Sequence, residues 1–504
     1  MNTFLNGMVD ETNFKRTENG GLAYKSTKRA VYDMFALCGA YRSRTDADCI
    51  LMFKNAFEED HNLALKCLFY LADCRGGQGE RRFFRVCFKW LAEKYPTVAR
   101  KNIANIPEYR RWDDILYSCV GTPVEDDALK FIKHQLALDV ECKTPSLLAK
   151  WLPSENASSK ETCIMGNTVR KYLGWTHKQY RKVLSELRTR INIVEKLMSQ
   201  GCWEEIEFDK IPSKAGLVYK NAFARRDLIA KKYEAFAKDE KTTVNAKTLY
   251  PYEVVEKANA GYDYWSNSCN LSKTDRLMIE KYWNNLPDYF NGKQSNMLCV
   301  VDTSGSMRGT PINVAISLGM YCAERAGGPF KDHYISFSSR PQLIKIQGID
   351  FVDKVRRIYN TNLCENTNLT GVFDMLFDIA KKPETKREDI PKTIVVISDM
   401  EIEFGASGNY FYWKNKTFTS WNHHNAETEM EKIRKEWAAA GFELPRLVYW
   451  NCNARSNTIL DSGNNVSFVS GMSPSIFEQV ITGKNGWDLC LEKLCSARYE
   501  AVVA

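Results

Sequence analysis

The 504 residues predict a multidomain protein, with an α-helical repeat domain over residues 1–290 and a doubly wound α/β domain over residues 291–504. Three observations predict this fold class. Apolar residues recur at helical spacing through the first part, and short apolar strands alternate with helices in the second part. Hydrophobic residues make up 44% of the chain, which is enough to form packed cores.

In the first part, apolar residues spaced three and four apart predict a succession of helices. The clearest are Lys28–Leu37, Asn62–Ala72, Glu80–Glu93, Ala128–Leu138 and Lys178–Met198. Connectors with glycine or proline separate them, and strand-like alternation is scarce. This succession predicts stacked helical pairs, an α-solenoid whose repeats are degenerate because no sharp sequence repeat occurs.

In the second part, short apolar runs predict strands between helices. The predicted strands are Met297–Val301, Tyr334–Ser338, Lys392–Ile397, Leu447–Trp450 and Val466–Val469. The predicted helices are Pro311–Arg325, Phe351–Ile358, Gly371–Lys381 and Ala426–Ala440. The run KTIVVI lacks alternation, which indicates a central strand buried on both faces. Strand–helix alternation over 200 residues is typical of a doubly wound domain.

Several classes of protein are disfavoured by the sequence. No run of about 18 apolar residues occurs, so we expect a cytoplasmic protein without a membrane span. The 16 cysteines are scattered and include no CxxC pair, and the histidines lack zinc-site spacing, so we expect reduced thiols and no zinc. No Walker A, dinucleotide-binding, GxSxG or kinase signature is found, so we expect no enzymatic activity.

Oxygen-bearing side chains follow two of the predicted strands, after Val301 and after the run ending VVIS. Because the carboxyl ends of parallel strands open on one crevice, we expect these side chains to converge. The five candidate ligands are Asp302, Ser304, Ser306 and Asp399, which follow these strands, and Thr367, which lies in a loop that enters a predicted helix. Two carboxylates and three hydroxyls suit Mg²⁺, with Mn²⁺ or Ca²⁺ as substitutes. Glu401 and Glu403 follow as groups behind the ligands or as solvated loop charges.

The segment DTSGSM, with its strand, threonine and aspartate context, resembles the metal-ion-dependent adhesion site of von Willebrand factor type A domains. The resemblance covers about residues 296–501. It implies a Rossmann-like domain in which the five residues above coordinate the metal, with Thr370 one helical step from Thr367. The alternative is a surface turn capped by Asp or Ser.

Positive charge is concentrated between residues 160 and 238, where 17 Lys and Arg stand against nine Asp and Glu, an excess equal to the formal net charge of +8 of the whole chain. In the predicted helix Lys178–Met198, cationic residues fall on one face and apolar residues on the opposite one. The candidate RNA-binding residues are Arg170, Lys171, Lys178, Arg181, Lys182, Arg188, Lys214, Lys220, Arg225 and Arg226. They predict contacts with a phosphate backbone, and the alternative is an ordinary solvated face.

Long segments resemble a TROVE-related family of unknown function from plants, large viruses and phages. They are RTENGGLAY, ALKCLFYLADCRGGQGE, KWLPS, TLYPYEV, NTNLTGVFDML, VVISDMEIE and LVYWNCNARS. A helical-repeat half before a von Willebrand A domain is also the architecture of the Ro ribonucleoproteins. That resemblance implies HEAT-like repeats in a solenoid or ring, with structured or misfolded non-coding RNA on a basic outer surface.

We therefore expect a non-catalytic, Ro-like RNA-binding protein that also carries a Mg²⁺-dependent ligand site. Its expected partners are structured non-coding RNA and an acidic protein ligand at the metal. The alternative is a protein–protein adaptor that uses the metal site to recruit an acidic side chain and binds no RNA.

Overall fold

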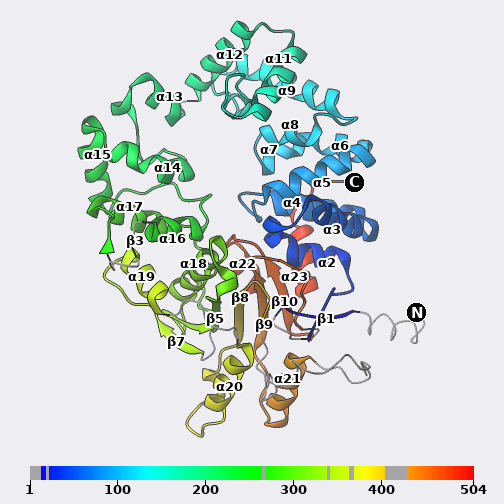
Figure 1. Ribbon diagram of the computed structural model, residues 1–504, viewed down its shortest axis with the longest axis vertical. Coiled ribbons are helices and arrows are strands. Elements are labelled where there is room, and N and C mark those ends of the chain that lie inside the picture. The colour runs from blue at the N-terminus through cyan, green and yellow to red at the C-terminus, as the bar shows by residue number, and fades with distance from the viewer. Residues whose placement is uncertain are drawn as a thin grey trace, which may run out of the picture. The chain divides into compact units, whose positions relative to one another are not determined.

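The computed structural model describes residues 13–18, 22–191, 193–260, 262–263, 268–337, 341–361, 368–402, 428–461 and 463–504. The chain divides into two compact units, whose elements are labelled in Figure 1. The helical unit consists of residues 46–249 and 494–504, and the α/β unit consists of residues 1–45 and 250–493.

The helical unit is a succession of helices joined by short connectors. Its α-helices are α3 (Asp46–Glu59), α4 (His61–Ala72), α5 (Arg81–Lys94), α6 (Pro96–Asn102), α7 (Ile106–Tyr109), α8 (Asp113–Cys119), α9 (Glu125–Glu141), α10 (Leu148–Trp151), α11 (Lys160–Leu173), α12 (His177–Arg190), α13 (Val194–Gln200), α14 (Ser213–Ala224) and α15 (Asp227–Lys238). Helices pack mainly on neighbours in sequence, such as α3 on α4, α8 on α9 and α14 on α15. This confirms an α-helical first part, while closure into a ring stays a prediction.

The predicted helix Lys178–Met198 is wrong as a single element. Helix α12 begins behind a capping box formed by Thr176 and Gln179 and ends at Arg190, and α13 begins at Val194. The residues around the break are mostly β-branched, Ile191, Ile193 and Val194, which lowers helix propensity there.

The α/β unit is built on a six-stranded sheet in the order β10-β9-β8-β5-β6-β7. The strands are β5 (Met297–Asp302), β6 (His333–Phe337), β7 (Gln342–Lys345), β8 (Thr393–Ser398), β9 (Arg446–Asn451) and β10 (Val466–Ser470). Neighbouring strands are parallel except β6 and β7, which pair antiparallel at one edge. The five predicted strands are confirmed, and β7 was not predicted because its four residues include no continuous apolar run.

Helices cover this sheet and extend the unit. They are α2 (Ala30–Leu37), α16 (Pro251–Asn259), α17 (Lys273–Asn284), α18 (Thr310–Arg325), α19 (Phe351–Thr361), α20 (Leu369–Ala380), α21 (Glu429–Ala439), α22 (Ile476–Val480) and α23 (Gly486–Leu494). Helix α18 packs on β5, β8 and β6, and α2 packs on β10. Gly319 permits the close approach of α18, since a Cβ there would lie 2.4 Å from Cγ2 of Val301.

The compact units differ from the predicted division at residues 290 and 291. The sheet does begin near that point, with β5 at Met297. However, α16 packs on α18 and α19, and its Val254 and Val255 are fully buried, so this helix belongs to the α/β unit. Two short antiparallel pairs complete the unit, β1 (Phe14–Arg16) with β2 (Leu22–Tyr24) and β3 (Tyr262–Asp263) with β4 (Ser268–Cys269).

Candidate metal site and cationic surface

Two carboxylates lie at the carboxyl ends of neighbouring parallel strands. Asp302 is the last residue of β5, and Asp399 directly follows β8. These strands pair in parallel, with Val301 opposite Ile397, so both aspartates emerge at the same edge of the sheet. Asp302 is fully buried and Asp399 is 1% exposed. The predicted convergence of these two residues is therefore present in the fold.

Serine hydroxyls surround Asp302. The backbone N–H of Ser304 donates to Asp302 Oδ1 at 2.9 Å, and the hydroxyl oxygens of Ser304 and Ser306 lie 2.9 Å apart. The hydroxyl of Ser398, the last residue of β8, donates to Asp302 Oδ2 at 2.5 Å. Ser306 is exposed, so the hydroxyl-lined side of the site is open to solvent.

The backbone beyond β8 is held in an unusual conformation. Met400, next to Asp399, has a φ of 65°, in the left-handed region that an unbranched side chain enters only at a cost. Its N–H donates to Ser398 Oγ at 3.1 Å, and the N–H of Glu401 donates to Asp399 Oδ1 at 3.2 Å. The second of these bonds orients the Asp399 carboxylate, and the first holds the turn that follows β8.

Burial makes the two carboxylates costly to ionise together. Burial and the charge of Asp399 raise the pKa of Asp302 to about 6, against hydrogen bonds from Ser398 and Ser304 that lower it. Burial also raises the pKa of Asp399, which the Glu401 N–H and the Arg455 charge lower in part. A pair of buried carboxylates of this kind is stabilised by a cation placed between them.

One cation already contacts the pair. Arg455, in the loop after β9, donates from Nη2 to Asp399 Oδ2 at 3.1 Å and lies with Nη1 2.9 Å from Glu18. Arg455 carries one positive charge against the two negative charges of Asp302 and Asp399. The sequence offered no signal for Arg455 or for the Ser398 contact, because each depends on which strands become neighbours.

Glu401 is a buried group behind the candidate ligands and not a solvated charge. It is 2% exposed, and one carboxylate oxygen accepts hydrogen bonds from Ser456 at 2.5 Å and from Thr458 at 3.2 Å. Its other oxygen accepts from the N–H of Glu18 at 2.7 Å. Lys15 also donates to the Ser456 and Thr458 hydroxyls, at 2.7 and 2.9 Å. Glu403 lies outside the described residues.

The remaining predicted ligand, Thr367, also lies outside the described residues. In α20, the neighbouring Thr370 has a buried hydroxyl oxygen with no hydrogen-bond partner among the residues that the structure describes. Within the same residues, no group of three or more His, Cys, Asp or Glu is arranged to hold a metal. The donors at Asp302 and Asp399 are carboxylates and hydroxyls, the oxygen ligands that a hard cation such as Mg²⁺ prefers.

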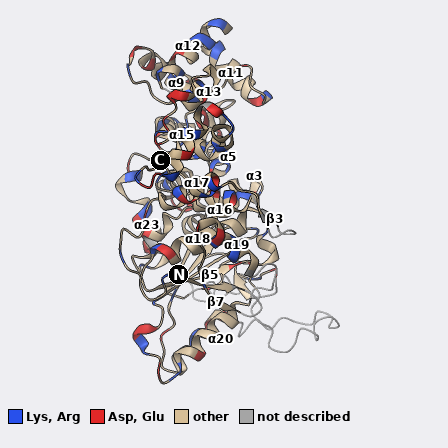
Figure 2. Cartoon of the chain, turned by 90° about the vertical axis from the view of Figure 1, so that its left-hand side faces the viewer, with Lys and Arg blue, Asp and Glu red and all other residues tan. Residues whose placement is uncertain are grey.

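Seven of the ten candidate RNA-binding residues are exposed on the helical unit. They are Lys171, Lys178, Arg181, Lys182, Lys214, Arg225 and Arg226. Figure 2 shows Lys and Arg along α12. Lys182 lies 3.8 Å from Glu186 in an exposed ion pair, and Arg226 stacks over the Trp203 ring at 4.5 Å.

The side chains of the other three candidates are buried or bonded to neighbouring residues. The Arg188 guanidinium donates to the carbonyls of Ala149 and Leu152, at 2.8 and 2.9 Å, which lie at the end of α10. Arg170 is paired with Glu155 at 2.6 Å, and Lys220 is 8% exposed. The prediction that Arg188 belongs to the cationic face offered to phosphates is therefore corrected, because its guanidinium is engaged by helix-end carbonyls.

Two further expectations can be compared with the structure. No disulfide joins the cysteines of the described part of the chain. Among the helices in that part, none combines the length and the apolar character needed to cross a lipid bilayer.

Comparisons with known proteins find similarity to uncharacterised families. A model described as a domain of unknown function (DUF2828) matches residues 17–113 and 146–293, and a second one (DUF7788) matches residues 296–490. An uncharacterised protein of Acanthamoeba polyphaga mimivirus, L728, is 27% identical over 94% of this chain and 85% of its own length. The crystal structure of the Deinococcus radiodurans Ro (RSR) protein aligns with 95% of this chain and all of its own, at 12% identity and a TM-score of 0.46. The chain is thus similar to domain families without an assigned function over both of its parts.

Proposed function

We propose that the protein is a non-catalytic binding protein with a Mg²⁺-dependent ligand site in its α/β unit and an RNA-binding surface on its helical unit. The observation that carries the metal site is the buried pair Asp302 and Asp399 at one edge of the sheet. Bound Mg²⁺ would be held by these carboxylates and by Ser304 and Ser306. It would supply a positive charge that an acidic group of a partner can approach from the open side at Ser306.

The fold supports a von Willebrand A assignment for the α/β unit. Its sheet has five parallel strands and one antiparallel edge strand, and the sequence Asp302-x-Ser304-x-Ser306 begins at the end of a central strand. The residues of the site present carboxylate and hydroxyl oxygens to a bound cation. No candidate general base accompanies them in the described residues, since Glu401 is engaged by Ser456, Thr458 and Glu18.

RNA binding is supported by the charge of the helical unit. Seven of the candidate Lys and Arg are exposed, and they lie within residues 160–238, a region with eight more basic than acidic residues. Such a surface contacts phosphates and binds RNA with little dependence on base sequence. We propose structured non-coding RNA as the partner, HEAT-like repeats as the scaffold and the cytoplasm as the location.

The experiment that tests RNA binding is crosslinking in cells, followed by sequencing of the RNA bound to the full chain. The ultraviolet absorbance of the purified protein gives an earlier indication. Bound nucleic acid raises the absorbance at the wavelength of the bases relative to that at the wavelength of the aromatic side chains. Recovery of specific RNAs supports the proposal. Protein without RNA, together with a Mg²⁺-dependent protein partner, would favour the adaptor function.

A further inference from the structure

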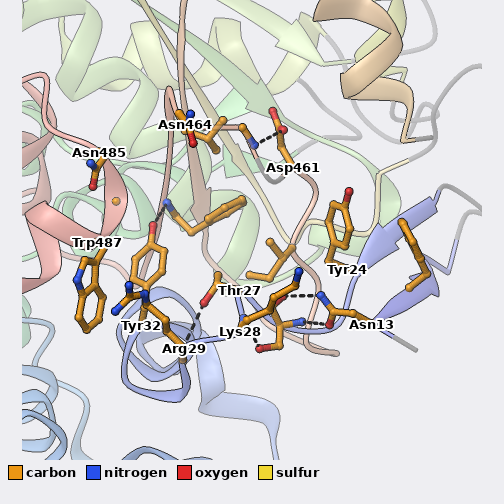
Figure 3. Close-up of a pocket in the computed structure, with 17 residues that line it drawn as sticks. Asn13, Tyr24, Thr27, Lys28, Arg29, Tyr32, Asp461, Asn464, Asn485 and Trp487 are labelled. Atoms are coloured by element: carbon orange, nitrogen blue, oxygen red, sulfur yellow. Dashed lines mark hydrogen bonds between the residues drawn. The ribbon is translucent and has the colours of Figure 1, made fainter. Parts of the chain in front are cut away.

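The α/β unit contains a cavity of about 650 Å³. The residues that line it do not include the candidate metal ligands. Its walls come from β1 and β2, the start of α2, the loop before β10 and the start of α23. Figure 3 shows Asn13 and Tyr24 on one side, Arg29, Tyr32 and Trp487 on the other, and Lys28 between them. The volume is large enough for a ligand of mononucleotide size.

One wall of the cavity is aromatic. Phe14 and Tyr24 face each other across the β1–β2 pair, with ring centroids 4.9 Å apart, and both are only half-buried. The Tyr24 hydroxyl is fixed by a 2.8 Å hydrogen bond to Glu431. These two rings, tilted by 32° to each other, therefore form a positioned aromatic surface against which a planar group can stack.

The opposite wall is aromatic and cationic. The Arg29 guanidinium lies 4.4 Å from the centre of the Trp487 ring, so one ring face is already covered. Tyr32 supports this wall, since its ring packs edge-on to Trp487 at 6.3 Å and its hydroxyl accepts from the Phe468 N–H at 2.9 Å. Arg29 itself is exposed, so its charge faces the solvent-filled space.

Lys28 sits between the two walls in a constrained loop. Its φ of 68° lies in the left-handed region, which a lysine enters only at a cost in free energy. The conformation is held by the Ser26 hydroxyl, which accepts from the Lys28 N–H at 2.8 Å, and by Asp33, which accepts from the Thr27 N–H at 2.7 Å. Asn13 braces the same loop through two hydrogen bonds to the Ser26 backbone, at 3.0 and 3.1 Å.

The charge of the cavity is positive. Of the lining residues, Lys28 and Arg29 are cationic and Asp461 is the acidic one. The Asp461 carboxylate is fully buried and is neutralised by Arg434, at 2.6 and 3.2 Å, and by the Gly463 N–H at 2.9 Å. An anionic group is therefore favoured near Lys28 and Arg29.

We propose that this cavity binds a nucleoside phosphate, with the base on Phe14 and Tyr24 and the phosphate at Lys28 and Arg29. An aromatic wall, two cations and a neutralised carboxylate match the planar base and the anionic phosphate of one nucleotide. The exposed Asn464 supplies an amide that can hydrogen-bond to a base edge. The inference does not rest on the proposed RNA surface, because every lining residue belongs to the α/β unit.

The test is isothermal titration of the full chain with AMP, ribose 5-phosphate and adenosine. AMP is expected to bind more tightly than either fragment, since it alone presents both groups. Phe14→Leu should weaken AMP about tenfold and leave ribose 5-phosphate unchanged. The double substitution Lys28→Gln and Arg29→Gln should weaken AMP and ribose 5-phosphate about tenfold each and adenosine little.

Matched controls keep the result interpretable. Phe14→Tyr retains an aromatic ring and should retain AMP binding, which separates stacking from a folding defect. Lys25→Gln removes an exposed charge near the loop from a residue that does not line the cavity, and it should have no effect. Substitution of Lys178, Arg181 and Lys182 should also leave AMP affinity unchanged, which separates this inference from RNA binding by the helical unit.

A single-stranded oligonucleotide with a terminal phosphate distinguishes two sources of the ligand. Tighter binding of the oligonucleotide than of AMP, weakened by Phe14→Leu, would identify the end of an RNA strand. Tighter binding of AMP would identify a free nucleotide. The inference is overturned if AMP shows no saturable binding, if Phe14→Leu and the double substitution leave its affinity unchanged, or if an acidic peptide displaces it with greater affinity.

Discussion

Arg455 connects Asp399 of the candidate metal site to Glu18, with its guanidinium nitrogens 3.1 Å from the first carboxylate and 2.9 Å from the second. A residue of the loop after β9 thus partly neutralises the site. A metal ion entering the site would meet a positive charge that is already in contact with one of its ligands. Arg455 and Asp302 therefore affect cation binding in opposite directions.

Asp302→Ala should abolish the rise in melting temperature that Mg²⁺ gives the wild-type protein, because the variant loses one of two carboxylates. Thermal unfolding with and without Mg²⁺ measures the effect, and calorimetry measures the binding. Asp378→Ala is the matched control, since Asp378 is 73% exposed on α20 of the same unit. Equal Mg²⁺ binding in wild type and Asp302→Ala would show that the site is misassigned.

Arg455→Gln should bind Mg²⁺ more tightly than the wild type, because the competing positive charge is removed. We expect about a tenfold gain in affinity, which corresponds to about 1.4 kcal/mol. The same titration measures it. Weaker binding in this variant would mean that Arg455 orients Asp399 for the metal and does not compete with it.

The triple substitution of Lys178, Arg181 and Lys182 by Gln should weaken binding of RNA of any sequence. For each phosphate that is no longer neutralised, the slope of log affinity against log salt should flatten by about 0.7 to 0.9, so three phosphates give a change of about two to three. Filter binding over a range of salt concentrations measures the slope. The control substitutes Lys381, Lys382 and Lys386, three exposed lysines of the α/β unit, and matches the change in net charge. If both variants bind alike, α12 presents only a solvated face.

Arg188→Gln should lower the free energy of unfolding, whereas Arg181→Gln should leave it unchanged. Removing the guanidinium leaves the Ala149 and Leu152 carbonyls without their donor, which costs on the order of 1–3 kcal/mol. Urea unfolding followed by circular dichroism should show this loss for Arg188→Gln and no loss for Arg181→Gln. A destabilised Arg181→Gln would contradict its assignment as an exposed residue.

Arg498→Met should destabilise the helical unit by about 3 kcal/mol at neutral pH, because it leaves the fully buried Asp73 without its cation. Burial alone would raise the pKa of Asp73, but hydrogen bonds and the charge of Arg498 hold it below its ordinary value.

The pH dependence of this pair follows from the lowered pKa. The pairing stabilises the fold above the pKa of about 3.9 that an aspartate has in the unfolded chain, and this stabilisation is lost as the pH falls through the lower pKa of the folded state. The difference between wild type and Arg498→Met should therefore shrink on acidification below about pH 4. A difference that is constant with pH would indicate that the substitution acts through the packing of the Arg498 side chain.

The elements that could be predicted from the sequence are those that a pattern of neighbouring residues identifies. The apolar runs of β5 and β8 identify strands buried on both faces, and the aspartates at their ends were placed by the rule for parallel strands. The contacts of Ser398 with Asp302 and of Arg455 with Asp399 span 96 and 56 residues, and no local pattern records them. The contacts of Arg188 could not be predicted for the same reason. A helical wheel gives the direction of its side chain but not the carbonyls of α10 that it reaches.

The order of the two units along the chain has a consequence for protein synthesis. Residues 1–45 belong to the α/β unit, and the chain crosses into the helical unit at residue 46, returns at residue 250 and re-enters the helical unit at residue 494. The final segment supplies Arg498 and Tyr499, whose side chains bond to Asp73. A ribosome thus releases helices α3 to α15 well before the residues that neutralise Asp73. Until then the Asp73 carboxylate has the nearby backbone N–H of Arg75 but not the cation that pairs with it. The helical unit therefore gains this ion pair only after the whole α/β unit has been translated.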